Sequence, residues 1–251
     1  MNYNKIIILG FKRSGTSLLR VMLNSHPDIA IGPETKFMEK ITKNYPKTFD
    51  SFLEVTKREA ADFNFNKDQL RKIYDASNSA ESVMQNWCIA YKELTNKTIW
   101  GDKTPQNFKY LKLLSKKFPD ALYVHIVRHP FGVIRSTKKR GQYHGVRTIL
   151  GWFFSNYNTR FVKRKSYMFL RYEDFIKNPQ QYTDPILEKL GVEKIDLASI
   201  YRNYDHGRIA EGDSWNKEII KENRDPEVLT LKDKLLIKSI CWLYLKKYRY
   251  N

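Results

Sequence analysis

The feature that most constrains the fold is a glycine loop between an apolar run and an apolar helical segment near the N-terminus. The run YNKIIILGF (3–11) ends its aliphatic stretch at Gly10, which is typical of a parallel strand buried on both faces of a sheet. The segment SLLRVMLNSH (17–26) then repeats large apolar residues at helical spacing and ends before Pro27. A strand, a glycine loop and a helix in this order predict an anion site at the N-terminus of the helix.

The loop is close to the nucleotide-binding P-loop but lacks its lysine. The P-loop pattern is G-x-x-x-x-G-K-[ST], and Thr16 follows the second glycine where the lysine is required. Two cations come earlier instead, and the planar fork of an arginine suits phosphate or sulfate oxygens. Backbone N–H groups in such a loop can form an anion nest. We expect the anion to be bound by Lys12, Arg13, Ser14, Gly15, Thr16 and Ser17.

Strand-like and helix-like segments alternate along the rest of the chain. Further strands are expected in DIAIG, TIWGDK, DALYVHIV and SYMFLR, with helices between them and a last helix over LKDKLLIKSICWLYLKKY. This alternation predicts an α/β fold, a P-loop-like doubly wound parallel sheet flanked by helices, with ligands at the carboxyl ends of the strands. The 251 residues suit a single domain (1–251) with helical insertions at about 36–95 and 141–165.

The composition describes a folded, basic protein. With 41% hydrophobic residues the chain can bury a sizeable core, and no apolar run is long enough for a transmembrane helix or a signal peptide, so we expect a cytoplasmic protein. Cys88 and Cys241 lie in helical patterns without ligand spacing and are expected to be reduced packing residues. The net charge of +18 indicates an anionic partner. Nucleic acid is not expected, because no helix-turn-helix, zinc or RNP-type motif is present.

The ends of the strands favour chemistry without a metal. Triphosphate transfer on a P-loop uses an acidic metal ligand, usually at the end of a buried strand. The most apolar strand, DALYVHIV, is followed by Arg128-His129-Pro130, a cation in that place. A sulfuryl group carries less charge than a phosphoryl group, and its transfer can dispense with Mg²⁺. A metal-dependent P-loop kinase and a basic nucleic-acid-binding module remain the alternatives.

Four segments together resemble the signatures of sulfotransferases that use 3′-phosphoadenosine 5′-phosphosulfate (PAPS). They are FKRSGTSLLRVMLNSHPDIAIGPETKF, GDKTP, HIVRHPFGVIRSTKKR and LRYEDFIKNP, and they extend to about residue 190. The resemblance is greatest to the branch that contains the tyrosylprotein sulfotransferases and many bacterial relatives. It implies PAPS as sulfuryl donor, the desulfated nucleotide PAP as product, no metal, and a hydroxyl compound as acceptor. The insertions at about 36–95 and 141–165 match no cofactor motif, so we expect them to bind the acceptor.

The resemblance also implies roles for individual residues. Residues 13–17 would hold the 5′-phosphosulfate, with Arg13 also acting in catalysis, and Lys103 would neutralise the bridging oxygen as the bond to sulfur breaks. The remaining cofactor contacts implied are Arg128, Ser136 and Arg140 at the 3′-phosphate, Tyr172, and more loosely Trp215 and Lys217. Arg128 and Ser136 are eight apart, so a strand end and a point two helical turns later can face one ligand.

The general base and the acceptor are less constrained. In cytosolic sulfotransferases of small phenols and steroids, the base is a histidine two residues after the lysine, and Pro105 stands in that place here. In the branch of the tyrosylprotein sulfotransferases the base is a glutamate, which matches Glu34. Glu34 could instead stabilise the N-terminus of a helix that begins near Lys36, through the helix dipole. His144 is the next candidate for the base. The basic charge suits an anionic glycan or an acidic tyrosine peptide, while a lipid-linked sugar or a small phenol stays open.

The last helix allows two interpretations. Trp242, Tyr244, Lys246 and Lys247 could contact a membrane surface. The interpretation that we favour is core packing of its aliphatic residues, Leu235, Leu236, Ile240 and Leu243. The sequence does not indicate an oligomeric state.

Overall fold

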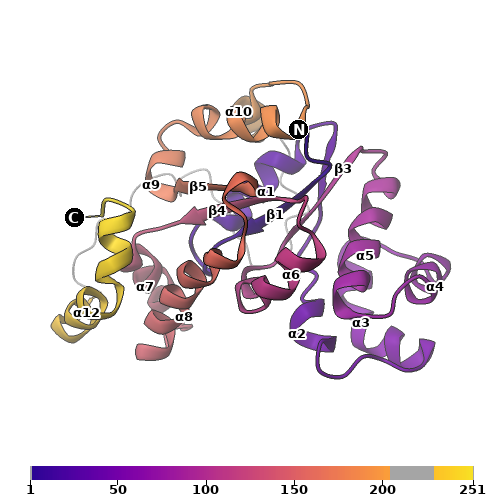
Figure 1. The fold of residues 1–251 in the computed structure, drawn as a ribbon, viewed down its shortest axis with the longest axis horizontal. Helices are drawn as coiled ribbons and strands as arrows, with labels where there is room; N and C mark the ends of the chain where they lie inside the picture. Colours follow the sequence, from indigo (N-terminus) through magenta and orange to yellow (C-terminus); the bar gives the residue numbers. More distant parts are fainter. Residues whose placement is uncertain (1, 204–228, 251) are drawn as a thin grey trace.

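The centre of the molecule is a five-stranded parallel sheet with the strand order β2-β3-β1-β4-β5 (Figure 1). The structure is a computed structural model, and it describes residues 2–203 and 229–250. The strands are β1 (Lys5–Leu9), β2 (Ile29–Ile31), β3 (Ile99–Lys103), β4 (Leu122–Val127) and β5 (Tyr167–Arg171). Every pairing between them is parallel, which confirms the doubly wound α/β prediction.

Helices cover both faces of the sheet. The α-helices are α1 (Thr16–Asn24), α2 (Phe37–Ile41), α3 (Phe49–Phe63), α4 (Lys67–Asp75), α5 (Ala80–Leu94), α6 (Leu111–Lys117), α7 (Pro130–Lys139), α8 (Val146–Tyr157), α9 (Tyr172–Phe175), α10 (Pro179–Leu190), α11 (Leu197–Asn203) and α12 (Leu231–Lys247). Short 3₁₀ helices are η1 (Pro105–Tyr110), η2 (Asn158–Phe161) and η3 (Arg164–Ser166). Figure 1 shows α3, α4 and α5 gathered at one side of the sheet and α7, α8 and α12 at the opposite side.

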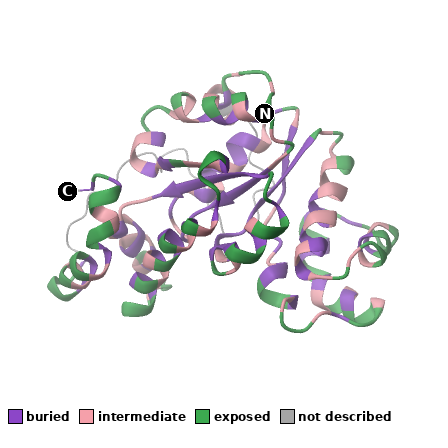
Figure 2. Cartoon of the chain, in the orientation of Figure 1, coloured by how far each residue is buried: buried purple, intermediate pink, exposed green. Residues whose placement is uncertain are grey.

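The alternation of side chains along β1 supplies two cores. Ile7 and Leu9 pack into one cluster with residues of α2–α6, while Ile6 and Ile8 pack on the other face with residues of α1, α10 and α11. Because both faces are covered, the strand reads as a continuous apolar run and not as alternating apolar and polar residues. Figure 2 shows the resulting buried sheet beneath helices whose outer faces are exposed.

The register of the sheet brings the functional loops together. Ile8 of β1 lies opposite Lys103 of β3 and Val124 of β4, and Ile31 of β2 lies opposite Gly101. All these strands run in one direction, so the segments that follow β1, β2, β3 and β4 emerge at the same edge. That edge carries most of the predicted site.

The predicted helical insertion at 36–95 is helical, and its helices begin at well-formed caps. Thr48, Asn66 and Ser79 each form a capping box at the start of α3, α4 and α5. The helices bury an aromatic cluster in which the ring of Trp87 lies 4.8 Å from that of Phe37. The second predicted insertion, 141–165, contains α8, which ends at Tyr157 and is continued by η2 to Phe161.

The favoured interpretation of the last helix is wrong for two of its residues. Leu235 is 60% exposed and Leu243 is 54% exposed. Trp242 is exposed too, at 55%. Helix α12 packs on α7 and α8 through a narrow stripe that includes Ile237 and Cys241, so its other apolar residues face outward. Cys88 and Cys241 are buried and unbridged, as expected. None of the helices among the described residues has the length and apolar character needed to cross a lipid bilayer.

Candidate active site

The anion loop is a tight turn with an arginine in an unfavourable backbone conformation. The Ser14 N–H donates to the Phe11 carbonyl at 3.0 Å, and Arg13, at the third position of this turn, has a φ of 75°. A side chain other than glycine costs of order 1 kcal/mol in this left-handed region. Gly15 has a φ of 92°, and a Cβ there would lie 2.4 Å from the ring of Tyr172. The loop therefore requires glycine at 15 and stores strain at 13.

Arg13, Arg128 and Ser136 lie together, although they come from three separate parts of the chain. The Arg13 Nε donates to the Ser136 Oγ at 3.1 Å, and the Arg128 Nη1 donates to the Arg13 carbonyl at 3.1 Å. The Arg128 guanidinium lies over the Tyr172 ring, 4.5 Å from its centre. Two guanidinium groups and a hydroxyl are thus collected beside the loop, a donor set suited to phosphate oxygens.

A half-buried carboxylate that sequence reasoning missed supports this cluster from behind. The Glu173 Oε1 accepts the His129 N–H at 2.8 Å, and its Oε2 accepts the Tyr250 hydroxyl at 2.7 Å. Burial, and then Arg171 and Arg135, lower the pKa of His129 to about 4, so its ring is neutral and its Nδ1 accepts the Phe131 N–H. The position of Arg128 is therefore fixed by a chain of contacts that reaches the C-terminal end of the described residues.

Lys103, Glu34 and Ser17 form a second cluster at the same edge of the sheet. The Lys103 Nζ donates to the Glu34 Oε1 at 2.7 Å and to the Ser17 Oγ at 3.2 Å. The Lys103 side chain is 3% exposed and that of Glu34 30%. Glu34 is also 3.9 Å from the Lys36 ammonium, and no bond to the N-terminal amides of α2 is present among the described residues. Its position favours a role beside Lys103 over helix capping.

Asp102 ties the two segments of this second cluster together, and sequence reasoning missed it too. Its Oδ1 accepts the hydroxyls of Thr35 at 2.9 Å and Thr104 at 3.1 Å, and its Oδ2 accepts the Asn107 side-chain amide at 2.8 Å. Burial raises the pKa of Asp102 to about 6, and the hydroxyl donors and Lys103 counteract part of that shift. Glu34 and Lys103 are direct neighbours of Thr35 and Thr104, so Asp102 holds both functional groups in register.

The carboxylate of Asp102 also corrects an expectation about strand ends. The strand β4 does end before a cation, but β3, which is equally buried, carries Asp102 one residue before its end. Both oxygens of that carboxylate are occupied by the three side-chain donors. The aspartate directly before Lys103 in GDKTP was the sequence signal that could have identified this strand-end carboxylate.

The remaining predicted residues lie in varied surroundings. Thr16 begins α1 and is buried, and the Ser14 hydroxyl is buried with no hydrogen-bond partner in the described part of the chain. Arg140 is the exposed C-terminal cap of α7. Trp215 and Lys217 lie outside the described residues.

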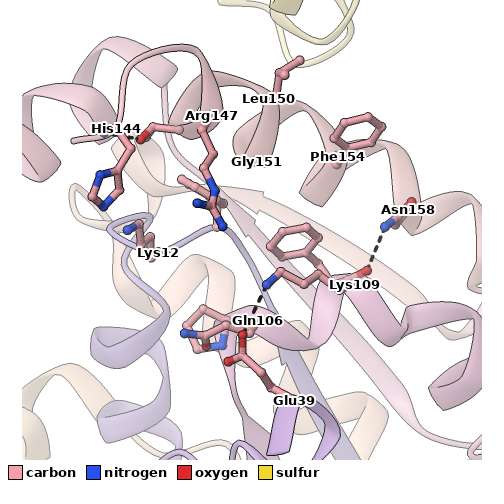
Figure 3. Close-up of a pocket in the computed structure, with 14 residues that line it drawn as sticks. Lys12, Glu39, Gln106, Lys109, His144, Arg147, Leu150, Gly151, Phe154 and Asn158 are labelled. Carbon is pink, nitrogen blue, oxygen red and sulfur yellow. Dashed lines mark hydrogen bonds and ion pairs between the residues drawn. The ribbon is translucent and has the colours of Figure 1, made fainter. Parts of the chain in front are cut away.

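A cavity of about 710 Å³ adjoins the loop (Figure 3). It lies between η1 and α8, with Lys12 and His144 at one end and Asn158 at the other. The residues that line it are Phe11, Lys12, Glu39, Pro105, Gln106, Phe108, Lys109, His144, Arg147, Thr148, Leu150, Gly151, Phe154 and Asn158. The 141–165 insertion contributes half of this wall, and of the 36–95 insertion only Glu39 takes part.

Comparison with known proteins places this site in a family context. The model of the sulfotransferase family matches residues 5–196. Protein-tyrosine sulfotransferase 1 of Danio rerio is 26% identical over 211 residues, which cover 76% of this chain and 55% of that protein. The chain thus spans about half the length of that relative.

Two solved structures share the fold over nearly the whole chain. The sulfotransferase domain of the Synechococcus PCC 7002 olefin synthase has a TM-score of 0.62 and 21% identity, over 96% of this chain and 95% of that one. Mouse sulfotransferase SULT7A1 complexed with PAP has a TM-score of 0.53 and 14% identity, over 99% of this chain and 85% of that one. At these identities the likeness concerns the fold.

Proposed function

The chain belongs to the sulfotransferase family, and we propose that it moves a sulfuryl group from PAPS to an acceptor hydroxyl without a metal. The observation that carries the proposal is the pairing of Lys103 with Glu34 and Ser17 directly beside the anion loop. An ammonium group for the leaving oxygen and a carboxylate for the acceptor proton are then within one cluster. The mouse relative of the same fold was solved with PAP, which fits this donor.

The residues beside the loop suit an anionic nucleotide. Arg13 and Arg128 supply planar donors, Ser136 supplies a hydroxyl, and the Ser14 hydroxyl is buried without a partner in the described part of the chain. We assign Arg13 to Ser17 to the 5′-phosphosulfate and Arg128 with Ser136 to the 3′-phosphate. The Tyr172 ring packs against Gly15 and beneath Arg128, so it supports both groups.

The transfer requires little covalent chemistry from the protein. A bond forms between the acceptor oxygen and sulfur, and the bond from sulfur to the bridging oxygen breaks with its electron pair left on the 5′-phosphate. Lys103 donates to that bridging oxygen, where charge develops only as the bond breaks, and Arg13 stabilises the charge on the transferred group. Glu34 accepts the proton of the acceptor hydroxyl. When Lys103 turns to the leaving oxygen, Glu34 loses the shorter of its two ion pairs and is available as base.

A metal-dependent kinase is less well supported. The carboxylate at the end of β3 is Asp102, and its oxygens accept three protein hydrogen bonds. Within the described residues, no group of three or more His, Cys, Asp or Glu side chains is arranged to hold a metal ion. The positive donor set beside the loop favours anionic oxygens bound directly by side chains.

Transfer of label from PAPS to pools of phenol, peptide and glycan acceptors tests the proposal. Glu34→Gln should lower turnover at least about a hundredfold, because it removes the base while PAP still binds. Lys103→Ala should also lower turnover more than it weakens PAP binding, since its charge acts on the breaking bond. Each variant removes the salt bridge between Glu34 and the buried Lys103 ammonium, so each can lower the fraction of folded protein. Turnover is therefore compared at equal amounts of protein that binds PAP.

Turnover of Glu34→Gln within a few-fold of wild type would remove Glu34 from the mechanism. His144, which lines the cavity, would then be the next residue to change. If no acceptor pool takes label while the wild-type protein binds ATP with Mg²⁺ in preference to PAP, the kinase alternative gains and the proposal fails.

A further inference from the structure

The cavity beside the anion loop is placed to receive the acceptor. Its wall includes Lys12, which precedes Arg13, and Pro105 and Gln106, which follow the Lys103–Thr104 strand end. It therefore adjoins both segments that carry the proposed chemistry. At about 710 Å³ it has the size of a site for a small molecule, not for a long polymer.

One side of the cavity is aromatic. Phe11 and Phe108 have ring centres 6.1 Å apart, and Phe154 adds a ring that is 45% exposed. Gly151 permits the contact of Phe11 with α8, because a Cβ there would lie 2.7 Å from the Phe11 ring. Such a wall suits the face of an aromatic ring.

Two uncharged polar groups of the wall are engaged already, while the buried Gln106 Oε1 has no hydrogen-bond partner among the described residues. The Thr148 hydroxyl accepts the His144 N–H at 3.0 Å, and the Asn158 amide donates to the Phe108 carbonyl at 2.9 Å. A sugar needs many hydrogen-bond partners for its hydroxyls, and a buried hydroxyl without one is costly. The wall therefore fits a glycan poorly.

The charges of the wall are unbalanced. Three cations, Lys12, Lys109 and Arg147, face one carboxylate, Glu39, which is 3.4 Å from the Lys109 ammonium. Within residues 2–203 and 229–250, neither Lys12 nor Arg147 has a carboxylate partner. Burial, and then the nearby charges of Arg13 and Arg147, lower the pKa of Lys12. In Figure 3 Arg147 extends from α8 into the cavity, on the side of Lys12 and His144.

We propose that this cavity binds the acceptor, and that the acceptor is a small aromatic hydroxyl compound with one anionic group. The ring packs on Phe108 and Phe154, and the anion pairs with Arg147 and Lys12. Two cations without a carboxylate partner suit one anionic group, whereas an acidic peptide with several carboxylates would need more cations than this wall offers. This inference rests on the proposed function, because the cavity matters only if the loop holds a sulfuryl donor.

Binding of matched probes to the protein saturated with PAP tests the inference. The probes are 3-(4-hydroxyphenyl)propionate, its neutral amide, glucuronate, and a tyrosine peptide with several acidic residues, each titrated by ligand-observed NMR. We expect the propionate to bind about fivefold more tightly than the amide, as for one partly exposed ion pair. Glucuronate and the peptide should bind more weakly than the propionate.

Variants assign the preference to the cavity. Arg147→Ala should reduce the advantage of the propionate over the amide, because only Lys12 then remains to pair with the anion. Arg58→Ala, which removes an exposed arginine of α3 outside the cavity, should leave the advantage intact. Phe154→Ala should weaken the propionate and the amide alike, by about two- to tenfold. Phe154 and Arg147 are both exposed, so neither change should affect folding.

The outcomes separate this inference from the function beneath it. If PAP does not bind, the proposed function fails and this inference fails with it. If PAP binds but the amide, glucuronate or the peptide binds as tightly as the propionate, only the acceptor class is wrong. A preference for the propionate that is as large in Arg147→Ala as in the wild-type protein would contradict the assigned site.

Discussion

At the scale of single residues, Arg13 combines a functional side chain with a strained backbone. Its φ of 75° is required by the turn, and its Nε binds Ser136. Arg13→Gly and Arg13→Ala both remove the guanidinium, but only glycine relieves the backbone. We expect the glycine variant to be about 1 kcal/mol more stable than the alanine variant, or about 2–4 °C higher in Tm. Both should lose the same affinity for PAP, measured by calorimetry, and equal melting temperatures would contradict a strained turn.

The raised pKa of Asp102 leads to a prediction about how the stability of the protein depends on pH. The pKa of its buried carboxyl is raised to about 6, above its ordinary value of 3.8, so the folded state holds the proton more tightly than the unfolded state does. The stability that this proton contributes is present below about pH 4 and is lost as the pH rises through 6. Relative to Asp102→Asn, the wild-type protein should lose about 2 kcal/mol of unfolding free energy between pH 4 and pH 7.

Denaturant titrations at the two pH values measure this difference. Asp68→Asn, on the exposed surface of α4, is the control for removing one carboxylate. A difference between wild type and Asp102→Asn that does not change with pH would show that Asp102 is ionised throughout this range.

At the scale of elements, the residues proposed to bind the 3′-phosphate, which follow β4 and lie along α7, differ in exposure. Arg128 lies half-buried before α7, Ser136 follows two turns later, and Arg140 is exposed at the C-terminal cap. Arg128→Ala should weaken PAP binding at least about tenfold, Ser136→Ala by about two- to tenfold, and Arg140→Ala by less than about fivefold. Isothermal titration with PAP gives the order, and a loss that is greatest for Arg140→Ala would show that the cofactor lies further along α7.

The elements also show which features local sequence determines. The strands follow from short apolar runs, and the loop with Arg128 and Ser136 follows from fixed spacings, so both were predictable. The hydrogen bonds of Asp102 with Thr35 and of Glu173 with Tyr250 join residues that are 67 and 77 positions apart. No local sequence pattern predicts such contacts. The packing of α12 was mistaken for a related reason, since only a narrow stripe of this helix meets α7 and α8.

At the scale of the whole molecule, the sheet acts as a frame that collects charge at one edge. Two clusters, one of Arg13, Arg128 and Ser136 and the other of Lys103, Glu34 and Ser17, come from the ends of neighbouring strands. The cavity with Lys12 and Arg147 adjoins the same edge. Part of the net charge of +18 is therefore concentrated where an anionic donor and an anionic acceptor would meet.

The proposed function requires that this edge of the sheet binds PAPS through its 3′-phosphate and without a metal. The most direct test compares the binding of PAP with that of AMP, which lacks only the 3′-phosphate, by calorimetry with and without EDTA. We predict that PAP binds at least about a hundredfold more tightly than AMP, as expected for a phosphate held by charged hydrogen bonds, and that EDTA changes neither value. Arg128→Ala should reduce this preference for PAP. Equal affinities for PAP and AMP, or a loss of PAP binding in EDTA, would contradict the account.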